Sequence, residues 1–277
     1  MTGPAHEAHG PQLVSFTTDY GLADGFVAAC HGVVARLAPR VRVLDVSHEI
    51  PPQAVRAGAE VLAQTAPYLP EAVHLVVVDP GVGTRRRGVV VVAGRGFLVG
   101  PDNGVLLPAA EALGGVRGAV ALTDPTWWLP EVSSTFHGRD VFAPVAAHLA
   151  AGVSAERVGE PVEPSGLVRL PEPICEVDDT GLRAEVLTVD RFGSVQLAAH
   201  AAQLPWSPGT AVTVHEQPAT VATTFADVAV GELAVLVDSA GHVAVAVNQG
   251  SAADRLAAGH GSVLDVRVAT DRSPPRG

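Results

Sequence analysis

Two aspartates stand directly after apolar runs that have the character of buried strands. Asp19 follows LVSFTT (13–18), and Asp79 follows VHLVVV (73–78). Ligands of open α/β sheets bind outside the carboxyl ends of the strands, so both carboxylates are candidates for a binding or acid–base site. An aspartate before a glycine-containing turn is also an ordinary turn or capping residue, and each aspartate alone is compatible with that interpretation.

The segment after Asp79 combines a glycine-containing loop, Pro80–Thr84, with three consecutive arginines, Arg85, Arg86 and Arg87. It is a poor phosphate loop, because no lysine follows and the next residues predict a strand rather than a helix N-terminus. A run of charges is usually a solvated surface. Because this run returns from the end of a buried strand, we expect that one of the arginines can face inward.

Lysine is absent from the chain, and all 18 basic residues are arginines. This excludes a Schiff base, a P-loop lysine and a kinase-type lysine. A cation at any site is therefore an arginine, which stays charged and cannot serve as a base.

Further candidates lie in short polar segments. Ser133–Asp140 contains His137 just before a helical pattern, and Asp24 stands where a helix cap belongs. Asp190–Gly193 and Asn248–Gly250 follow apolar runs near the C-terminus. Each of these segments is also compatible with an ordinary cap or hairpin turn.

The order of elements predicts the scaffold that must position these residues. Strand patterns at 13–19, 41–47 and 72–79 alternate with helical patterns at 25–39 and 53–69. Alternating strands and helices indicate a mostly parallel sheet with helices on its faces. Short strands follow, and then a further helix over 139–152.

The pattern changes after a proline-rich stretch, and beyond it apolar alternation with turn residues predicts a smaller all-β, barrel-like domain. The fold class is therefore α/β with a C-terminal β domain. We predict an N-terminal domain over 12–165, a linker over 166–173, a β domain over 174–269, and flexible ends over 1–11 and 270–277.

Composition narrows the setting. The formal net charge of −11 and the lack of basic patches argue against a nucleic-acid partner. No secretory leader and no spanning apolar run are apparent, and the two cysteines form no CxxC motif. We expect a cytoplasmic protein with no membrane partner.

The motifs are weak singly and specific together. In order along the chain stand TDYGLADGFVAACHG, SHEIPPQAVRAGA, VVDPGVGTRRR, GPDNGVL, WLPEVSSTFHGRDVFAP, DRFGS and AVNQG. The sequence resembles the S-adenosyl-L-methionine (SAM) hydroxide adenosyltransferases, or SAM hydrolases, which are related to the fluorinating and chlorinating nucleoside synthases. The resemblance covers about residues 12–268.

The resemblance implies hydrolysis of SAM to adenosine and L-methionine, with an aspartate, an arginine and a histidine that handle water. By motif position these correspond to Asp79, Arg86 and His137. The halogenating branch typically has tyrosine at the positions of the acid and the histidine, so this set favours water as the nucleophile.

The resemblance also implies substrate contacts. Asp19 corresponds to the residue that binds the ribose hydroxyls, and Asp24 and Asp190 to contacts near the methionine amine. Ser239 corresponds to a contact to the methionine carboxylate, and Asn248 to a contact to adenine.

Two departures concern the methionine end of the substrate. The family usually has asparagine where this chain has Ser194, and the halogenating relatives have arginine where it has Ala240.

The implied reaction is attack on the ribose C5′ while methionine leaves as a neutral thioether that needs no acid. The difficulty is the nucleophile, because free water has a pKa of about 15.7. An arginine beside the water favours hydroxide, a histidine accepts its proton near neutral pH, and an aspartate orients the set. No cluster has metal-ligand spacing, so we expect neither a metal nor a cofactor.

Two alternatives stay open at this point. One is a SAM-dependent halogenase that makes a 5′-halo-5′-deoxyadenosine, and the other is a non-catalytic protein that binds SAM or adenosine. The resemblance further implies a homotrimer with sites between subunits.

Overall fold

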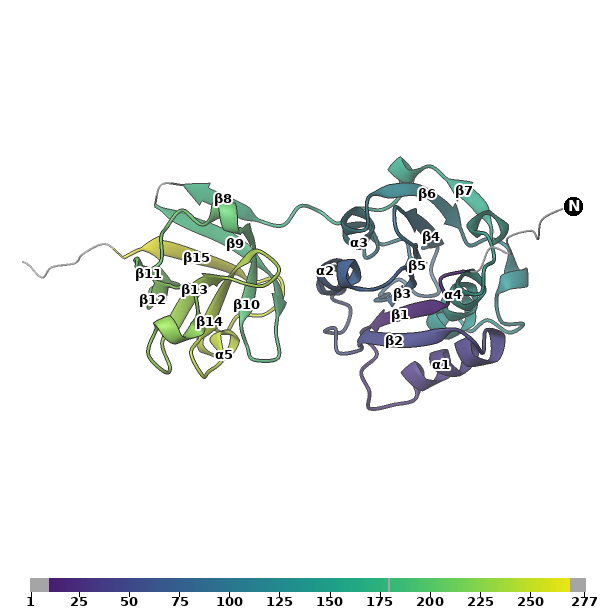
Figure 1. Cartoon of the computed structure of the whole chain (residues 1–277), viewed down its shortest axis with the longest axis horizontal. Coiled ribbons are helices and arrows are strands. Elements are labelled where there is room, and N and C mark those ends of the chain that lie inside the picture. The colour runs from purple at the N-terminus through teal and green to yellow at the C-terminus, as the bar shows by residue number, and fades with distance from the viewer. Residues whose placement is uncertain (1–9, 179, 270–277) are drawn as a thin grey trace, which may run out of the picture. The chain divides into compact units, whose positions relative to one another are not determined.

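The computed structural model describes residues 10–178 and 180–269, and the chain divides into two compact units between Leu170 and Pro171 (Figure 1). The predicted linker, 166–173, straddles this division. Most of the predicted flexible ends, namely 1–9 and 270–277, lies outside the described residues. None of the helices in the described part of the chain has the length and hydrophobicity needed to cross a bilayer.

The first unit is built on a sheet in which the described residues form seven strands, in the order β2-β1-β3-β5-β4-β6-β7. The strands are β1 (Leu13–Thr18), β2 (Arg42–Ser47), β3 (Val73–Val77), β4 (Gly88–Ala93), β5 (Phe97–Pro101), β6 (Val116–Ala121) and β7 (Glu160–Val162). The pairings from β2 to β5 are parallel, and those from β5 through β4 and β6 to β7 are antiparallel. The sheet is therefore mixed, with its parallel half where the alternation of strands and helices predicts it.

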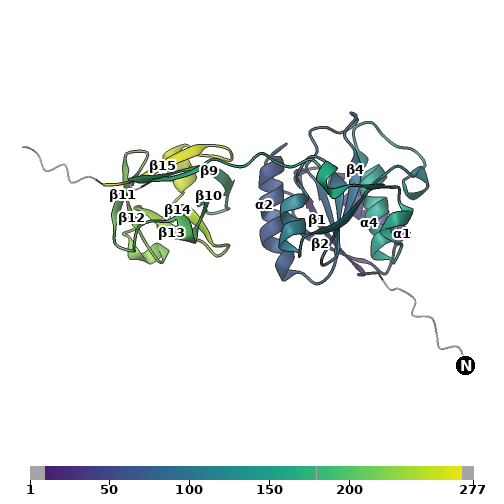
Figure 2. The same cartoon turned by 90° about the horizontal axis from the view of Figure 1, so that it is seen from above.

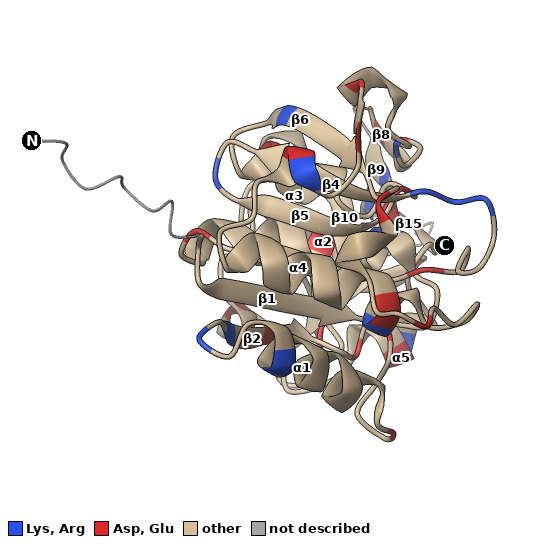
Figure 3. Cartoon of the chain, turned by 90° about the vertical axis from the view of Figure 1, so that its right-hand side faces the viewer, with Lys and Arg blue, Asp and Glu red and all other residues tan. Residues whose placement is uncertain are grey.

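Helices cover both faces of this sheet (Figure 2). Helices α1 (Phe26–Leu37) and α4 (Ala143–Ala150) pack on one face, and α2 (Val55–Thr65) and α3 (Leu107–Ala112) on the other. Alternate residues of β3 serve the two cores, Leu75 with α1 and α4 and Val76 with α2 and α3. A strand buried on both faces has no polar side to show, which explains its unbroken apolar run. Figure 3 shows α4, β1 and β5 free of charged residues.

The second unit is a closed barrel. Its strands are β8 (Cys175–Asp178), β9 (Gly181–Val189), β10 (Val195–His200), β11 (Ala211–Val214), β12 (Gln217–Val221), β13 (Leu233–Val237), β14 (His242–Val247) and β15 (Val263–Val268). The ladder runs β10-β14-β13-β12-β11-β15-β9, and pairing of β9 with β10 closes it, while β8 lies outside on β9. Closure leaves the ring without unpaired edges. A short helix, α5 (Ala252–Leu256), adds Ala252 to the barrel core.

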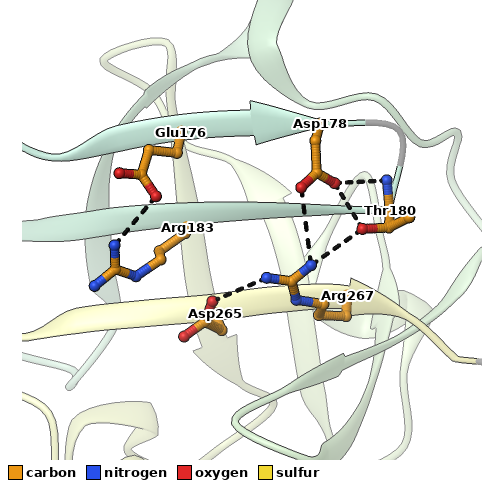
Figure 4. Close-up of polar contacts among 6 residues, drawn as sticks. All are labelled: Glu176, Asp178, Thr180, Arg183, Asp265 and Arg267. Carbon is orange, nitrogen blue, oxygen red and sulfur yellow. Dashed lines mark hydrogen bonds and ion pairs between the residues drawn. The ribbon is translucent and has the colours of Figure 1, made fainter.

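One exposed face of the barrel carries a polar ladder across β8, β9 and β15 (Figure 4). Arg183 donates to Glu176 at 3.1 Å, and Arg267 donates to Thr180 at 3.0 Å. All of these side chains are solvated, so each pair stabilises the fold by at most ~1 kcal/mol. The apolar interior, not this ladder, holds the barrel together.

Short turns of other helix types connect the main elements. They are η1 (Ala66–Tyr68), η2 (Pro125–Trp127), η4 (Ala155–Arg157), η5 (Pro164–Gly166), η6 (Ala201–Gln203), η7 (Phe225–Asp227) and the π-helical turn η3 (Gly138–Phe142). The sequence pattern predicted neither α3 nor α5, because both are too short to show a helical period.

Candidate active site

A buried ion pair connects two ends of the loop after β3. Arg86 Nε donates to Asp79 Oδ1 at 3.0 Å, and Arg86 Nη2 pairs with Asp79 Oδ2, so the contact is bidentate. The side chains of Arg86 and Asp79 are 9% and 5% exposed. The Arg86 guanidinium also stacks 5.2 Å from the ring centre of Phe142. This geometry fixes the guanidinium in orientation as well as in position.

The other two arginines of the run have different surroundings. Arg87 donates to Asp102 Oδ2 and to the carbonyl of Gly166, which holds the 166–170 segment on the first unit. Arg85 is exposed. The expectation that one arginine of the run faces inward is confirmed, and that arginine is Arg86.

His137 completes a three-residue chain of hydrogen bonds. Its Nδ1 lies 3.2 Å from Arg86 Nη2. A guanidinium nitrogen is always a donor, so Nδ1 accepts, and the proton of the neutral ring stands on Nε2. Burial, and then the charge of Arg86, lower the pKa of His137. The imidazole is therefore neutral at neutral pH and presents an N–H group from Nε2.

The loop that carries His137 is anchored by Asp140, a fully buried residue. Its carboxylate accepts hydrogen bonds from the Ser133 backbone N–H at 2.8 Å and from Arg139 Nε at 2.6 Å. Its backbone oxygen accepts from Leu129 N–H at 2.9 Å. Sequence reasoning treated this aspartate as a possible helix cap, whereas it positions the whole His137 loop.

Two glycines permit the close approaches that build the site. Gly83 has a positive φ of 75°, and a side chain there would run into the carbonyl of Ser134. A side chain at Gly138 would collide with the hydroxyl of Tyr20. Both contacts bring loops of different strands together, so larger residues at either position would push those loops apart.

A cavity of about 310 Å³ lies beside Asp79 and His137. Its volume is at the low end of the range for small-molecule sites. Its lining includes Asp19, Tyr20, Gln53, Asp79 and His137. Asp19 Oδ2 accepts a hydrogen bond from the Gln53 backbone N–H at 2.8 Å, which fixes this carboxylate at the cavity wall. The structure thus brings Asp19, Asp79 and His137 to one cavity at the carboxyl ends of β1 and β3.

Tyr20 is a cavity residue that sequence reasoning did not single out. Its ring packs against Phe26 and Phe136, and burial raises the pKa of its phenol. Asn103 was not singled out either, and it lies outside the cavity lining. Its amide donates to the Val78 carbonyl at 2.9 Å and so secures the strand end directly before Asp79.

Comparison with known proteins identifies the family of the chain. The family model of the SAM hydroxide adenosyltransferase N-terminal domain matches residues 14–159, and that of the C-terminal domain matches 184–265. The chain belongs to the SAM hydroxide adenosyltransferase family. The resemblance inferred from the sequence motifs is thereby confirmed.

Individual relatives of this adenosyltransferase chain differ in their similarity to it. An (R)-S-adenosyl-L-methionine hydrolase of Salinispora tropica is 62% identical over 91% of this chain and 97% of that protein. A fluorinase of Actinopolyspora mzabensis is 29% identical over 89% of this chain and 94% of that protein. A crystal structure of an uncharacterized conserved protein from Thermotoga maritima superposes with a TM-score of 0.84 at 36% identity, covering 92% of this chain and 99% of that one.

Two residues that the resemblance implies as substrate contacts make local hydrogen bonds in the structure. Asp24 is exposed and accepts from the Phe26 backbone N–H at 3.1 Å, and it is not part of the cavity lining. Asp190 accepts from the backbone N–H groups of Phe192 and Ser194 and closes the turn between β9 and β10. In these contacts both aspartates act as turn or cap residues.

Ser239 and Asn248 belong to the barrel unit, as does Asp190. Asn248 lies beside the Asp190 turn, just after β14, and donates through its amide to the Val228 carbonyl at 2.8 Å. Ser239 is exposed in the turn that precedes β14, next to Ala240. Asp190 and Ser239 therefore lie near opposite ends of β14. Their predicted meeting at the methionine end of SAM stays untested.

A group of possible metal ligands exists outside the cavity, although the sequence showed no such spacing. His31, Asp45 and His48 bring one ligand atom each to within 4.8 Å of one another. They come from α1, from β2 and from the segment after β2, so no short motif announces them.

Proposed function

We propose that this protein hydrolyses SAM to adenosine and L-methionine. Water attacks the ribose C5′, the bond from C5′ to the sulfonium sulfur breaks, and the bonding pair stays on sulfur. SAM and water thus give adenosine, methionine and one proton. The leaving thioether is neutral and needs no acid.

The observation that carries this proposal is the continuous hydrogen-bonded chain from Asp79 through Arg86 to His137 beside one cavity. It combines a fixed positive charge, a carboxylate and a polarised N–H group within a few ångströms. Such a set can hold a water molecule and favour its hydroxide form without further chemistry.

We infer from this geometry which groups donate and which accept protons. The Nε2–H of His137 donates to the oxygen of the attacking water, and Asp79 accepts a proton of that water through lone pairs not used by Arg86. The charge of Arg86 stabilises the developing hydroxide. Positioned acid–base groups of this kind supply roughly 10²–10⁴-fold.

This assignment differs from the expectation that the histidine accepts the proton. A second proton on the ring would stand on Nδ1, face to face with a guanidinium N–H. The neutral tautomer that leaves Nε2 free to accept a proton carries its own proton on Nδ1, so it has the same conflict with Arg86. We therefore give the proton-accepting role to Asp79.

The proposal includes no cofactor beyond the substrate itself. We expect dialysis against a chelator to leave turnover unchanged, because the groups assigned to water activation are all side chains. The homotrimer stays a proposal that rests on the family resemblance, and the cytoplasmic location stays one that rests on the composition of the sequence. Light scattering of the purified protein measures its mass and so tests the homotrimer. Cell fractionation tests the cytoplasmic location.

The test is product analysis by chromatography and mass spectrometry. We expect purified protein and SAM to yield adenosine and methionine, with ¹⁸O from labelled water at the 5′ oxygen. Asp79→Asn and His137→Ala should lower the rate by roughly 10²-fold or more. Turnover that survives in both variants would exclude the proposed water site.

Two other results would establish the alternatives. A 5′-chloro or 5′-fluoro nucleoside formed in the presence of halide would identify a halogenase. Tight calorimetric binding of SAM that is recovered intact would identify a binding protein.

A further inference from the structure

Three potential metal ligands converge where α1 crosses β2. His31 Nε2 lies 2.8 Å from Asp45 Oδ1, and His48 Nε2 lies 3.1 Å from the same oxygen. The side chain of His48 is 3% exposed, whereas those of His31 and Asp45 are 35% and 44% exposed. The group thus has a buried back wall and an open side through which an ion and water can enter.

The buried nitrogen of His48 is the informative atom. Despite its closeness to Asp45, its Nε2 makes no hydrogen bond to any described residue, because the carboxylate oxygen lies off the direction of an N–H bond. A buried polar atom without a partner is costly. The 3.1 Å between His48 Nε2 and Asp45 Oδ1 instead fits two ligands of one metal ion. Two ligands that lie about 2.0–2.1 Å from a zinc ion at a tetrahedral angle are roughly 3.3 Å apart.

The surroundings of His48 prepare Nε2 for coordination. Its Nδ1 lies 2.8 Å from Thr18 Oγ1, and that oxygen already accepts the Tyr20 backbone N–H at 3.2 Å. Accepting a second hydrogen bond from Nδ1–H leaves the lone pair of the ring on Nε2. Metal-bound histidines are held in this way by a partner on the other ring nitrogen.

The ring of Phe16 closes the apolar side of the group. Its centre lies 4.9 Å from that of His48 in an edge-on contact and 6.0 Å from that of His31. Phe16 is 1% exposed, so this side excludes water. Both imidazoles are therefore held by packing as well as by hydrogen bonds.

We propose that His31, Asp45 and His48 form a binding site for a divalent transition-metal ion of the zinc class, with water at the remaining position. Two imidazoles and one carboxylate are the donor types that zinc accepts, and one open position is common in three-ligand sites. None of the three residues lines the catalytic cavity. The ion ties helix α1 to strand β2 and to the segment that follows it.

This site is linked to the catalytic cavity through the Thr18 hydroxyl, which contacts both His48 and Tyr20, and through the backbone. The carbonyl of His48 accepts the Gly21 N–H at 2.7 Å, and Thr18 precedes Asp19 directly. The role that follows is structural: the ion stabilises the segments that carry one wall of the cavity. In the free protein His31 Nε2–H donates to Asp45. Metal binding replaces that hydrogen bond, because the lone pair of Nε2 is then directed at the ion.

The experiment uses the full chain without a histidine tag. Zinc binding is measured by calorimetry, and cobalt binding by the visible absorption of a low-symmetry site. We expect one saturable site per chain and a higher melting temperature with zinc. His31→Gln and Asp45→Asn should weaken binding at least about tenfold, because each removes a ligand.

The matched control is His200→Gln. His200 and His242 form another close histidine pair, with ring centres 4.2 Å apart, and the substitution removes one imidazole there. We expect zinc affinity and the cobalt spectrum to remain those of the native chain. His31 is half-exposed, so His31→Gln is expected to fold, which circular dichroism checks.

Three results would overturn the proposal. They are the absence of saturable zinc binding to the native chain, equal affinity in folded His31→Gln, and loss of binding in His200→Gln alone. Loss of binding in both His31→Gln and Asp45→Asn, with His200→Gln unaffected, supports it. Product formation from SAM is measured separately and does not enter this decision.

Discussion

Arg86 donates hydrogen bonds to three acceptor atoms, two in Asp79 and one in His137. The arrangement of these atoms explains why an arginine occupies this position. Two donors meet the carboxylate of Asp79 side by side, and the Nη2 group also reaches His137 Nδ1. A lysine ammonium carries the same charge on one atom and has no planar fork. The absence of lysine from the chain therefore removes nothing that this site needs.

Arg86→Lys tests this geometry at constant charge. We expect kcat to fall by roughly 10²–10⁴-fold, because the orientation of Asp79 and His137 is lost while the positive charge remains. Adenosine release measured by liquid chromatography gives the rate. Arg85→Lys, at the exposed neighbouring position, is the control and should match the native chain. Equal rates for the two variants would contradict the assigned role of Arg86.

The pH dependence of turnover tests His137. Its pKa is lowered by burial and by Arg86, so it lies below the ordinary value of about 6.5. The neutral ring is the active form, because protonation puts a second donor against Arg86. We expect kcat/KM to hold its full value above that pKa and to fall as pH falls through it. His137→Gln, which cannot titrate, should lack this acid limb; an unchanged limb would assign it to another group.

At the scale of elements, the central strands β1 and β3 are joined by a polar contact inside the core. Ser15 Oγ lies 2.7 Å from His74 Nδ1, and both residues are buried. Burial, and then the charge of Arg95, lower the pKa of His74 to about 4. The folded protein therefore holds this imidazole neutral at pH values where the unfolded chain already protonates it.

The stability of the first unit should depend on His74 in a defined pH window. The unfolded chain binds the extra proton below about 6.5 and the folded chain only below about 4, so stability is full above 6.5 and falls between the two values. The loss amounts to ~3 kcal/mol at 1.36 kcal/mol per pH unit. His74→Asn keeps a polar partner for Ser15 and should show a shallower decline in denaturant unfolding. Identical pH profiles for the two proteins would refute this source of acid sensitivity.

The strands and long helices of the first unit follow from local patterns, whereas the turns at the site do not. β1 and β3 are apolar throughout, and α1 and α2 show a helical period. The helical pattern over 139–152 does not distinguish the π-helical turn at Gly138–Phe142 from an α-helix, because that turn depends on Tyr20 from another strand end and on the buried carboxylate of Asp140. Contacts between distant segments select such a turn, and a single-segment pattern contains no record of them.

At the scale of the whole molecule, the two units are built on separate apolar cores. Every buried apolar cluster among the described residues draws its members from one unit only. The barrel closes its own ladder through the pairing of β9 with β10. Each unit therefore contains the interactions that stabilise it.

Residues 171–277 expressed alone should accordingly fold. We expect a β-type circular dichroism spectrum, a cooperative unfolding transition, and slow amide exchange in β13 and β14, the buried strands of the barrel. The intact chain, measured in parallel, provides the reference exchange rates. Uniformly fast exchange in the fragment would mean that the barrel needs the first unit for its stability.

The sequence by itself determined the kinds of residues at the strand ends and the alternation that brings Asp19 and Asp79 to one edge, because parallel strands end on the same side of a sheet. It also carried the motifs that indicate the family. Only the tertiary structure decided that Arg86 turns inward while Arg87 pairs with Asp102. The contact with Arg86, which determines the tautomer of His137, also comes from the tertiary structure. So does the position of Ser239 at the end of β14 opposite to the Asp190 turn. Local propensity and periodicity act within a few residues, whereas these outcomes depend on packing between segments that lie tens of residues apart in the chain.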